Sequence, residues 1–270
     1  MKQQADYKNW LPEWLCPMGV AGCGVCAAAL ASALKKQRKQ GVGKRCSIVA
    51  GVAMLVMTAL TTWAALLTHA FSYRNEKGVA RRILNGVSAQ VKLPDGGCGL
   101  DVGCGSGALT IACAKQNPQA RMVGVDLWGK NYVYSREVCE NNARLEGVDN
   151  VAFRAGDARQ LDFPDESFDA VTSNFVYHNI PAADHQALLL ETLRVLKKGG
   201  VFVIHDIMPR SKYGDMEAFV AQLRALGYEE VQLIETTNGL FTSHGKAMLM
   251  RMNGAKLLMG KNDYKNSPRF

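Results

Sequence analysis

Three glycines at alternate positions lie in the stretch LDVGCGSG, the most informative part of this sequence. Gly103, Gly105 and Gly107 allow a tight turn and let a ligand approach where any Cβ would collide. Asp101 precedes them, and Asp126 lies nineteen residues beyond the last glycine. A carboxylate at that distance can accept hydrogen bonds from both hydroxyls of a ribose. The pattern therefore predicts a turn that binds a nucleoside.

The glycine spacing separates two nucleotide chemistries. A dinucleotide-binding turn reads GxGxxG and presents amides at a helix start to a pyrophosphate. This turn reads GxGxG with Asp101 just before it, and a carboxylate there suits a cationic ammonium and repels a pyrophosphate. The only YxxxK pair, Tyr73 with Lys77, precedes the turn, whereas a short-chain dehydrogenase carries its pair well after it. An NAD-dependent oxidoreductase is therefore a disfavoured alternative.

The segments that would position this turn alternate between strand and helix. Short apolar runs predict strands at 98–103, 121–126, 151–155, 168–174 and 200–206. Apolar residues at i, i+3 and i+4 predict intervening helices at 108–116, 131–147 and 184–198, followed by a helix at 215–227 and two closing strands at 228–236 and 246–252. The alternation implies an α/β fold: a Rossmann-like, seven-stranded, mostly parallel sheet with helices on both faces. Ligands of such sheets bind beyond the carboxyl ends of the strands.

The segment DVGCGSG resembles motif I of the class I S-adenosylmethionine-dependent methyltransferases. Four further segments resemble family motifs in the same order: VGVDLWG, AGDARQLDFPDESFDAV, SFDAVTSNFVYHNI and LRVLKKGGVFVIHD. The resemblance covers roughly residues 90–260. It is closest to small-molecule members of the ubiquinone/menaquinone type and to membrane-anchored bacterial homologues. It implies an enzyme that uses S-adenosylmethionine as its cofactor and methylates a small-molecule or lipid-like acceptor.

The resemblance also implies which residues bind the cofactor. Asp126 would bind the ribose and Leu127 would pack on the adenine, while Asp157 would accept from the adenine amino group with Ala158 close to the ring. The implied cofactor-binding residues are Asp101, Gly103, Cys104, Gly105, Gly107, Asp126, Leu127, Asp157, Ala158 and Asn174.

Candidate catalytic residues follow the fourth and fifth strands. Methyl transfer from a sulfonium is an in-line displacement, so the protein chiefly aligns the nucleophile and excludes water. A base is needed only where the acceptor must lose a proton. Tyr177, His178 and Asp206 are the candidates near the methyl group, whereas His205 lies within an apolar strand and is expected to be structural. A third reading is a tethered domain that binds the cofactor without catalysis, as a sensor or scaffold.

Nucleic acid is not an expected partner. The first 82 residues carry twelve Lys and Arg against three acidic residues, a net +9, and the remainder has a net charge of −1. The main domain thus lacks the basic footprint that phosphate binding requires. Asn174 is followed by Phe175, so the Asn-Pro-Pro-Tyr signature of enzymes that methylate nucleic-acid bases is also missing. Cys23 and Cys26 lie in an apolar run without partner ligands, and no metal site is expected.

The N-terminal residues 1–82 are expected to form a membrane anchor, followed by a methyltransferase domain at 83–262 and a disordered tail at 263–270. Apolar helices at about 14–34 and 47–71 are long enough to cross a bilayer, and they flank the basic stretch KKQRKQGVGKR. Six basic residues lie in this stretch, and six lie beyond the opposite ends of the two apolar helices. The positive-inside tendency therefore does not decide which end faces the cytoplasm. A domain that uses S-adenosylmethionine is expected in the cytosol. We therefore expect the catalytic domain on the cytoplasmic side of a bacterial-type membrane and the basic stretch on the outside.

Overall fold

The computed structural model describes residues 4–9, 11–12, 14–40, 44–129, 134–181 and 184–262. The described residues divide into two compact units, one formed by residues 9–81 and the other by residues 82–262 together with 4–8.

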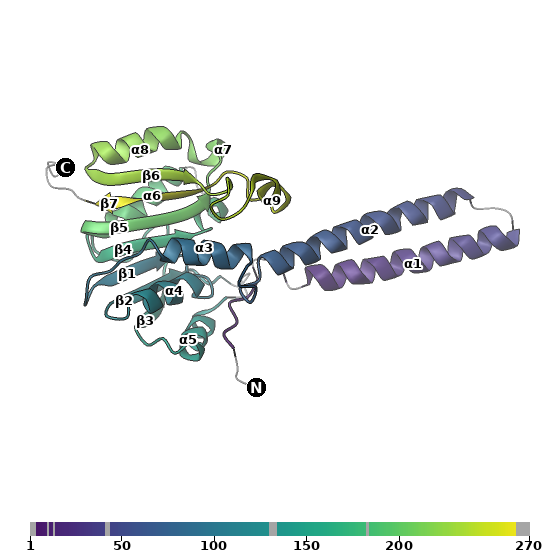
Figure 1. Ribbon diagram of the computed structural model, residues 1–270, viewed down its shortest axis with the longest axis horizontal. Coiled ribbons are helices and arrows are strands. Elements are labelled where there is room, and N and C mark those ends of the chain that lie inside the picture. Colours follow the sequence, from purple (N-terminus) through teal and green to yellow (C-terminus); the bar gives the residue numbers. More distant parts are fainter. Residues whose placement is uncertain are drawn as a thin grey trace. The chain divides into compact units, whose positions relative to one another are not determined.

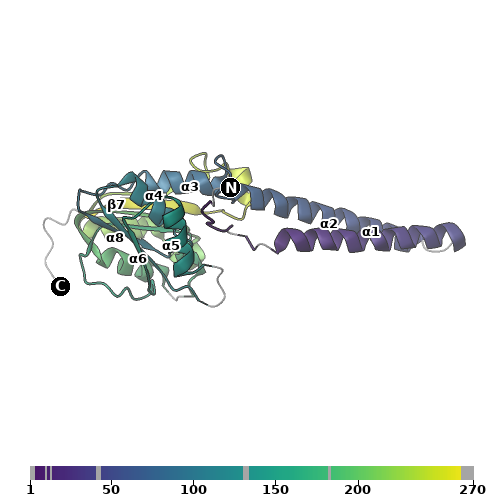
Figure 2. The same cartoon turned by 90° about the horizontal axis from the view of Figure 1, so that it is seen from below.

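The N-terminal unit is a pair of long antiparallel helices, α1 (Leu15–Gln40) and α2 (Lys44–Ala70), which lie side by side in Figures 1 and 2. Both are long and apolar enough to cross a membrane, and almost none of their apolar stretch is buried within the protein. Small residues bring the helices together, since a Cβ on Gly19 would lie 2.7 Å from Oγ1 of Thr61. The Cys23 thiol also contacts this hydroxyl, at 3.5 Å.

The basic stretch between the two apolar segments is largely helical. Residues 35–39 belong to the last turns of α1, and Lys44 and Arg45 begin α2. Residues 41–43 lie outside the described residues. Basic side chains suit the C-terminus of α1, where they complement the negative end of the helix dipole. Most of the basic stretch therefore belongs to the ends of these two helices and not to a loop between them.

A seven-stranded sheet forms the second unit, in the order β3-β2-β1-β4-β5-β7-β6 (Figure 1). The strands are β1 (Cys98–Val102), β2 (Arg121–Asp126), β3 (Val151–Ala155), β4 (Phe168–Asn174), β5 (Leu196–Ile207), β6 (Tyr228–Glu235) and β7 (Ala255–Asn262). Neighbouring strands from β3 to β5 pair in parallel, and β7 is antiparallel to both β5 and β6. The predicted fold class is confirmed.

Helices cover both faces of the sheet, with α3 and α4 on one face and α6 and α8 on the other (Figures 1 and 2). Hydroxyl and carboxylate caps start several of them; the side chain of Asp184, for example, accepts from the amides of Gln186 and Ala187 at the start of α6. The helices of this unit are α3 (Val79–Ser88), α4 (Ala108–Gln116), α5 (Arg136–Leu145), α6 (His185–Arg194), α7 (Arg210–Tyr213), α8 (Met216–Ala225) and α9 (His244–Leu249).

One predicted strand is wrong. Residues 246–252 do not close the sheet, because most of them belong to α9 and to the turn after it, and the closing strand is β7 at Ala255–Asn262. The continuous apolar run at 247–250 is as compatible with a helix as with a strand, and Lys, Ala, Met and Leu favour helix. The predicted helix at 184–198 also ends earlier, since β5 begins at Leu196. The predicted tail at 263–270, and the first part of the helix predicted at 131–147, lie outside the described residues.

The core lies around the three central strands. Leu100 and Val102 of β1, Val171 of β4, and Phe202 and Ile204 of β5 are all fully buried. Strands covered on both faces need such continuous apolar runs. Strand order reverses between β1 and β4, because β1 connects outward to β2 while β4 and β5 continue on its other side. The carboxyl ends of β1, β2, β4 and β5 therefore share one edge, where a ligand of this type of sheet binds.

Candidate active site

The glycine turn follows β1 directly and uses the backbone freedom predicted for it. Gly103, Gly105 and Gly107 all have positive φ, at 71°, 55° and 83°. A Cβ on Gly103 would come within 2.3 Å of Cγ2 of Val176, so only glycine fits there. The amides of Gly103 and Cys104 donate to the carbonyl of Val125, and the Gly107 amide donates to Cys104. These amides therefore donate hydrogen bonds within the protein and do not point at a phosphate.

Asp126 ends β2 and braces the same turn. Its Oδ2 accepts from the Gly105 amide at 2.9 Å, and its Oδ1 accepts from the Trp128 amide at 3.0 Å. The Trp128 indole donates in turn to the Gly105 carbonyl at 2.9 Å. A carboxylate can accept about four hydrogen bonds. Counting donors among the described residues, acceptor positions thus remain on this carboxylate for hydroxyl groups of a ligand beside the turn.

Asp101 lies under the turn and not on its surface. Its side chain is buried, and its two oxygens accept from the hydroxyls of Thr110 at 2.6 Å and Thr172 at 2.9 Å. Burial raises the pKa of Asp101 to about 7, and the two threonine hydrogen bonds oppose that rise only in part. Asp101 consequently positions β1 against α4 and β4. Sequence reasoning missed both threonines, because a buried carboxylate selects its partners only when the strands and helix are assembled.

Three other residues surround the turn. Leu127 follows Asp126 and is 59% exposed, which leaves an apolar side chain open beside the carboxylate. The Cys104 thiol is buried, and burial raises its pKa, so it fills space under the turn. The ring of Tyr134 lies 3.8 Å from the position of a Cβ on Gly105. Leu127 and Tyr134 thus supply apolar surface close to the turn.

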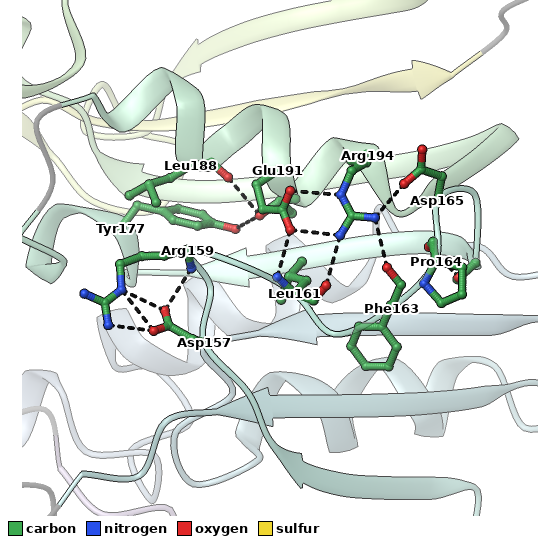
Figure 3. A network of polar contacts seen from close by, with 12 residues as sticks. Asp157, Arg159, Leu161, Phe163, Pro164, Asp165, Tyr177, Leu188, Glu191 and Arg194 are labelled. Atoms are coloured by element: carbon green, nitrogen blue, oxygen red, sulfur yellow. Dashed lines mark hydrogen bonds and ion pairs between the residues drawn. The ribbon is translucent and has the colours of Figure 1, made fainter.

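The loop after β3 holds Asp157 by an ion pair with Arg159. The guanidinium contacts the carboxylate at 2.6 Å, and this pairing lowers the pKa of Asp157 (Figure 3). Ala158 packs partly buried against the core. In this arrangement Asp157 reaches a ligand only by sharing its carboxylate with Arg159.

Arg194 fixes the path of that loop from α6. Its guanidinium donates to the carbonyls of Leu161 and Phe163, each at 2.9 Å, and pairs with Asp165 at 2.6 Å (Figure 3). Glu191 orients the guanidinium and also accepts from the Leu161 amide at 2.8 Å. The sequence offered no signal for this arginine, because its partners are backbone carbonyls about 30 residues earlier in the chain.

His178 and Asp206 meet at the carboxyl edge of β4 and β5. The chain turns sharply after β4 at Phe175, which has a φ of 56°, and a short 3-10 helix (Tyr177–Asn179) then directs the His178 ring at the Asp206 carboxylate. Asp206 also accepts from the Ile207 amide at 2.7 Å and the Tyr213 hydroxyl at 3.1 Å. A carboxylate fixed by several donors can in turn orient an imidazole.

The same short helix points Tyr177 the other way. Its side chain is fully buried and its hydroxyl contacts Thr192 at 2.6 Å (Figure 3). Burial raises the pKa of Tyr177 well above its usual value. We therefore remove Tyr177 from the catalytic candidates, because a core side chain cannot reach an acceptor.

His205 and Asn174 form a second pair within the sheet. His205 Nδ1 contacts the Asn174 side-chain oxygen at 2.8 Å, and its Nε2 contacts the Thr236 hydroxyl at 3.0 Å. Burial lowers the pKa of His205 to about 4, so it is neutral and structural, as expected. Asn174 lies at the end of β4 with its side-chain oxygen engaged by this histidine. Among the described residues, no group of three His, Cys, Asp or Glu side chains is arranged to hold a metal ion.

Comparison with known proteins identifies the family. Residues 100–204 match a family model described as a methyltransferase domain. This part of the chain is a class I methyltransferase domain. Its predicted cofactor, S-adenosylmethionine, is supported by this assignment. The match includes the glycine turn, Asp126, Asp157 and His178, and it ends two residues before Asp206.

Curated relatives of the methyltransferase domain include demethylmenaquinone methyltransferases. The chain is 33% identical over 139 residues to the protein of Geobacillus stearothermophilus, covering 51% of this chain and 57% of the relative. It is 37% identical over 113 residues to the protein of Lactobacillus johnsonii, covering 41% of this chain and 44% of the relative. The chain thus matches about half the length of these curated relatives.

Solved structures similar to the methyltransferase domain show its fold. The O-methyltransferase region of StiE, residues 961–1257, has a TM-score of 0.54 and 19% identity, covering 74% of this chain and 81% of that chain. The [4+2]-cyclase SpnF has a TM-score of 0.52 and 21% identity, covering 67% of this chain and 80% of that chain. One of these proteins is named as a cyclase, so the fold alone does not determine the reaction.

The side chains around the turn of the methyltransferase domain fit S-adenosylmethionine better than a dinucleotide. Asp126 retains acceptor positions for ribose hydroxyls, and the exposed Leu127 offers an apolar surface for a base. The amides of Gly103, Cys104 and Gly105 are occupied, and two carboxylates lie close by at Asp101 and Asp126. This environment suits a ligand with hydroxyl groups and positive charge and disfavours a pyrophosphate.

Proposed function

We propose that this chain is a membrane-anchored S-adenosylmethionine-dependent methyltransferase that methylates a small, lipid-like acceptor, with its catalytic unit on the cytoplasmic side. The pairing of His178 with the buried Asp206, at the strand edge that carries the glycine turn, supports catalysis most directly. A domain that only binds the cofactor has no need of an imidazole oriented by a carboxylate.

The two residues have complementary parts in this proposal. A carboxylate accepts hydrogen bonds, so Nδ1 of His178 donates to Asp206 and Nε2 is left as the proton acceptor. S-adenosylmethionine supplies an electrophilic methyl group, whose bond to sulfur breaks with the electron pair retained by sulfur. His178 takes the acceptor's proton at Nε2 while the acceptor's electron pair forms the bond to the methyl carbon. Asp206 stabilises the imidazolium that results.

The cofactor would be held by the glycine turn and its neighbours. Asp126 would bind the ribose hydroxyls, Leu127 would pack on the adenine, and Asp157 with Ala158 would lie on the adenine side. Asp101, Cys104 and Asn174 are buried or engaged within the protein, and we assign them the role of supporting the turn and the strand ends.

The acceptor class follows from the relatives and from the N-terminal helices. The curated relatives are named for demethylmenaquinone, a quinone with a lipid tail, and we propose an acceptor of similar chemistry. Two helices able to span a membrane would keep the enzyme where such an acceptor partitions. Apolar side chains such as Val25, Leu55 and Leu66 are exposed along these helices, which is costly in water and favourable in lipid.

Methyl transfer by the full chain in nanodiscs tests the proposal. We expect label from S-adenosylmethionine carrying a labelled methyl group to enter reduced demethylmenaquinone or a compound of a bacterial lipid extract. His178→Ala should bind the cofactor as well as the wild type and transfer little label. Equal incorporation by both proteins would refute the assigned base, and saturable binding of NAD in place of S-adenosylmethionine would refute the enzyme class. Binding of S-adenosylmethionine without transfer to any compound would favour the sensor or scaffold.

A further inference from the structure

The connection between β6 and β7, residues 236–254, borders the edge of the sheet that carries the His178–Asp206 pair. Because β7 is antiparallel to both β5 and β6, β6 ends and β7 begins at the edge where β5 ends. The Thr236 hydroxyl contacts His205 at 3.0 Å, and the Met208 amide donates to the Gly254 carbonyl at 2.9 Å. The connection therefore lies beside the candidate acceptor site.

One side of this connection is packed into the protein. Phe241, Ala247 and Met252 are buried, and a Cβ on Gly86 would lie 2.2 Å from the Phe241 ring. The amide of Phe241 also donates to the Thr236 carbonyl at 3.0 Å. Because these contacts fix its path, the residues on its outer side are presented by an ordered segment.

The exposed side chains of this connection include apolar and basic ones. Leu240 is 52% exposed and Met248 is 60% exposed. Lys246 and Arg251 are exposed on the same connection, and residues 236–254 contain no Asp or Glu. Glu235 just before it accepts from the Thr237 hydroxyl at 2.5 Å. Exposed apolar side chains among basic ones are the combination that binds the surface of an anionic bilayer.

We propose that the connection at 236–254 contacts an anionic lipid leaflet, with Leu240 and Met248 inserted among the headgroups and Lys246 and Arg251 on the lipid phosphates. A membrane is the occupant that this chain itself suggests, because it carries two helices apolar enough to span one. The contact would hold the edge of the sheet that carries the His178–Asp206 pair at the lipid surface. The inference rests on the membrane location in the proposed function and is independent of methyl transfer.

Hydrogen exchange of the full chain in nanodiscs tests this contact. One preparation contains phosphatidylcholine alone, and in the other a third of the lipid is phosphatidylglycerol. We expect amides at 238–251 to exchange about fivefold more slowly in the anionic discs for each basic residue in contact. Lys246→Glu combined with Arg251→Glu should abolish the difference. Lys92→Glu, an exposed site before β1 at the opposite edge of the sheet, is the matched control and should preserve it.

Several results would overturn the contact. Equal exchange of the wild type in both lipids would do so, as would a difference that survives in the double variant. Protection of β5 amides in every sample shows that the variants are folded. A second variant, Leu240→Ser with Met248→Ser, should reduce protection in the anionic discs without changing the charge, and unchanged protection there would contradict insertion. Failure of the chain to co-purify with nanodiscs would refute the anchor itself, and methyl transfer on the same samples is scored separately.

Discussion

The imidazole of His178 hydrogen-bonds through Nδ1 to Oδ1 of Asp206, a fully buried carboxylate, while 21% of the His178 side chain remains exposed. The two residues come from the ends of neighbouring parallel strands and are 28 positions apart in the sequence. Lys212 also donates to the His178 carbonyl at 2.6 Å, which fixes the backbone of the short helix. The pair thus presents one imidazole nitrogen outward from a rigid support.

Removing this imidazole should slow methyl transfer without weakening cofactor binding. General-base catalysis contributes about 10²- to 10⁴-fold, so we expect His178→Ala to lower kcat by that order. Tyr177→Phe is the matched control from the same turn. It loses the buried hydroxyl's contacts, including that to Thr192, and should keep kcat within about twofold while costing about 1 kcal/mol of stability. Steady-state kinetics and cofactor titration measure both, and a large fall in kcat for Tyr177→Phe would restore that residue as a candidate.

Gly103→Ala should abolish cofactor binding or folding of the turn. The added Cβ would lie 2.3 Å from Val176, and the backbone there has a φ of 71°. Gly96→Ala is a strict control, because Gly96 has a φ of 73° but no atom within 4 Å of the new Cβ. It should cost about 1 to 2 kcal/mol through backbone strain alone and leave cofactor affinity unchanged. Equal loss of affinity in both variants would mean that strain, and not the contact with Val176, limits this position.

Asp126→Asn should weaken binding of S-adenosylmethionine about a hundredfold, since hydrogen bonds to a charged group are worth about 1.5 to 3 kcal/mol. The amide would also replace an acceptor that now serves Gly105 and Trp128. Asp95→Asn, an exposed acid before β1, is the control and should bind normally. Isothermal titration decides the matter, and unchanged affinity for Asp126→Asn would exclude the ribose assignment.

Stability should decline with pH because of Asp101. Burial raises its pKa from 3.8 to about 7, so between these values the unfolded chain loses a proton that the folded chain keeps. The free energy of unfolding then falls as pH rises from about 4 to about 7, by up to about 4 kcal/mol, and is constant above that range with respect to this group. Asp101→Asn resembles the protonated acid and should lack the decline. Urea unfolding of both proteins across this range measures the difference, and parallel curves would show that Asp101 is ionised in the folded state.

Arg194→Ala should destabilise the loop after β3. The substitution removes hydrogen bonds to two backbone carbonyls and an ion pair with Asp165, for a cost of about 2 to 3 kcal/mol. Arg194→Lys should recover little of this stability, because one ammonium cannot replace the several donors of the planar guanidinium. Arg210→Ala is the control, since its ion pair with Asp215 is exposed and is worth less than about 1 kcal/mol. Urea unfolding and exchange of the amides at 157–165 provide the readout.

The fold and the cofactor class could be read from the sequence because they depend on local pattern. Strand and helix periodicity, the GxGxG spacing and an acid at the end of the next strand each extend over a few residues. The strand predicted at 246–252 was wrong although it rested on the same local reasoning. A short apolar run suits a helix as well as a buried strand, and β5 pairs with residues of β7, Ala255–Asn262, instead.

The tertiary structure decided which of the candidate side chains face a ligand. Adjacent residues in the sequence took opposite roles when the chain turned after β4: Tyr177 entered the core, and His178 met Asp206. Asp101 likewise became a buried support because Thr110 and Thr172 approach it from another helix and strand. A local pattern fixes where a side chain occurs along an element, but its direction and partners follow from the packing of elements that are distant in sequence.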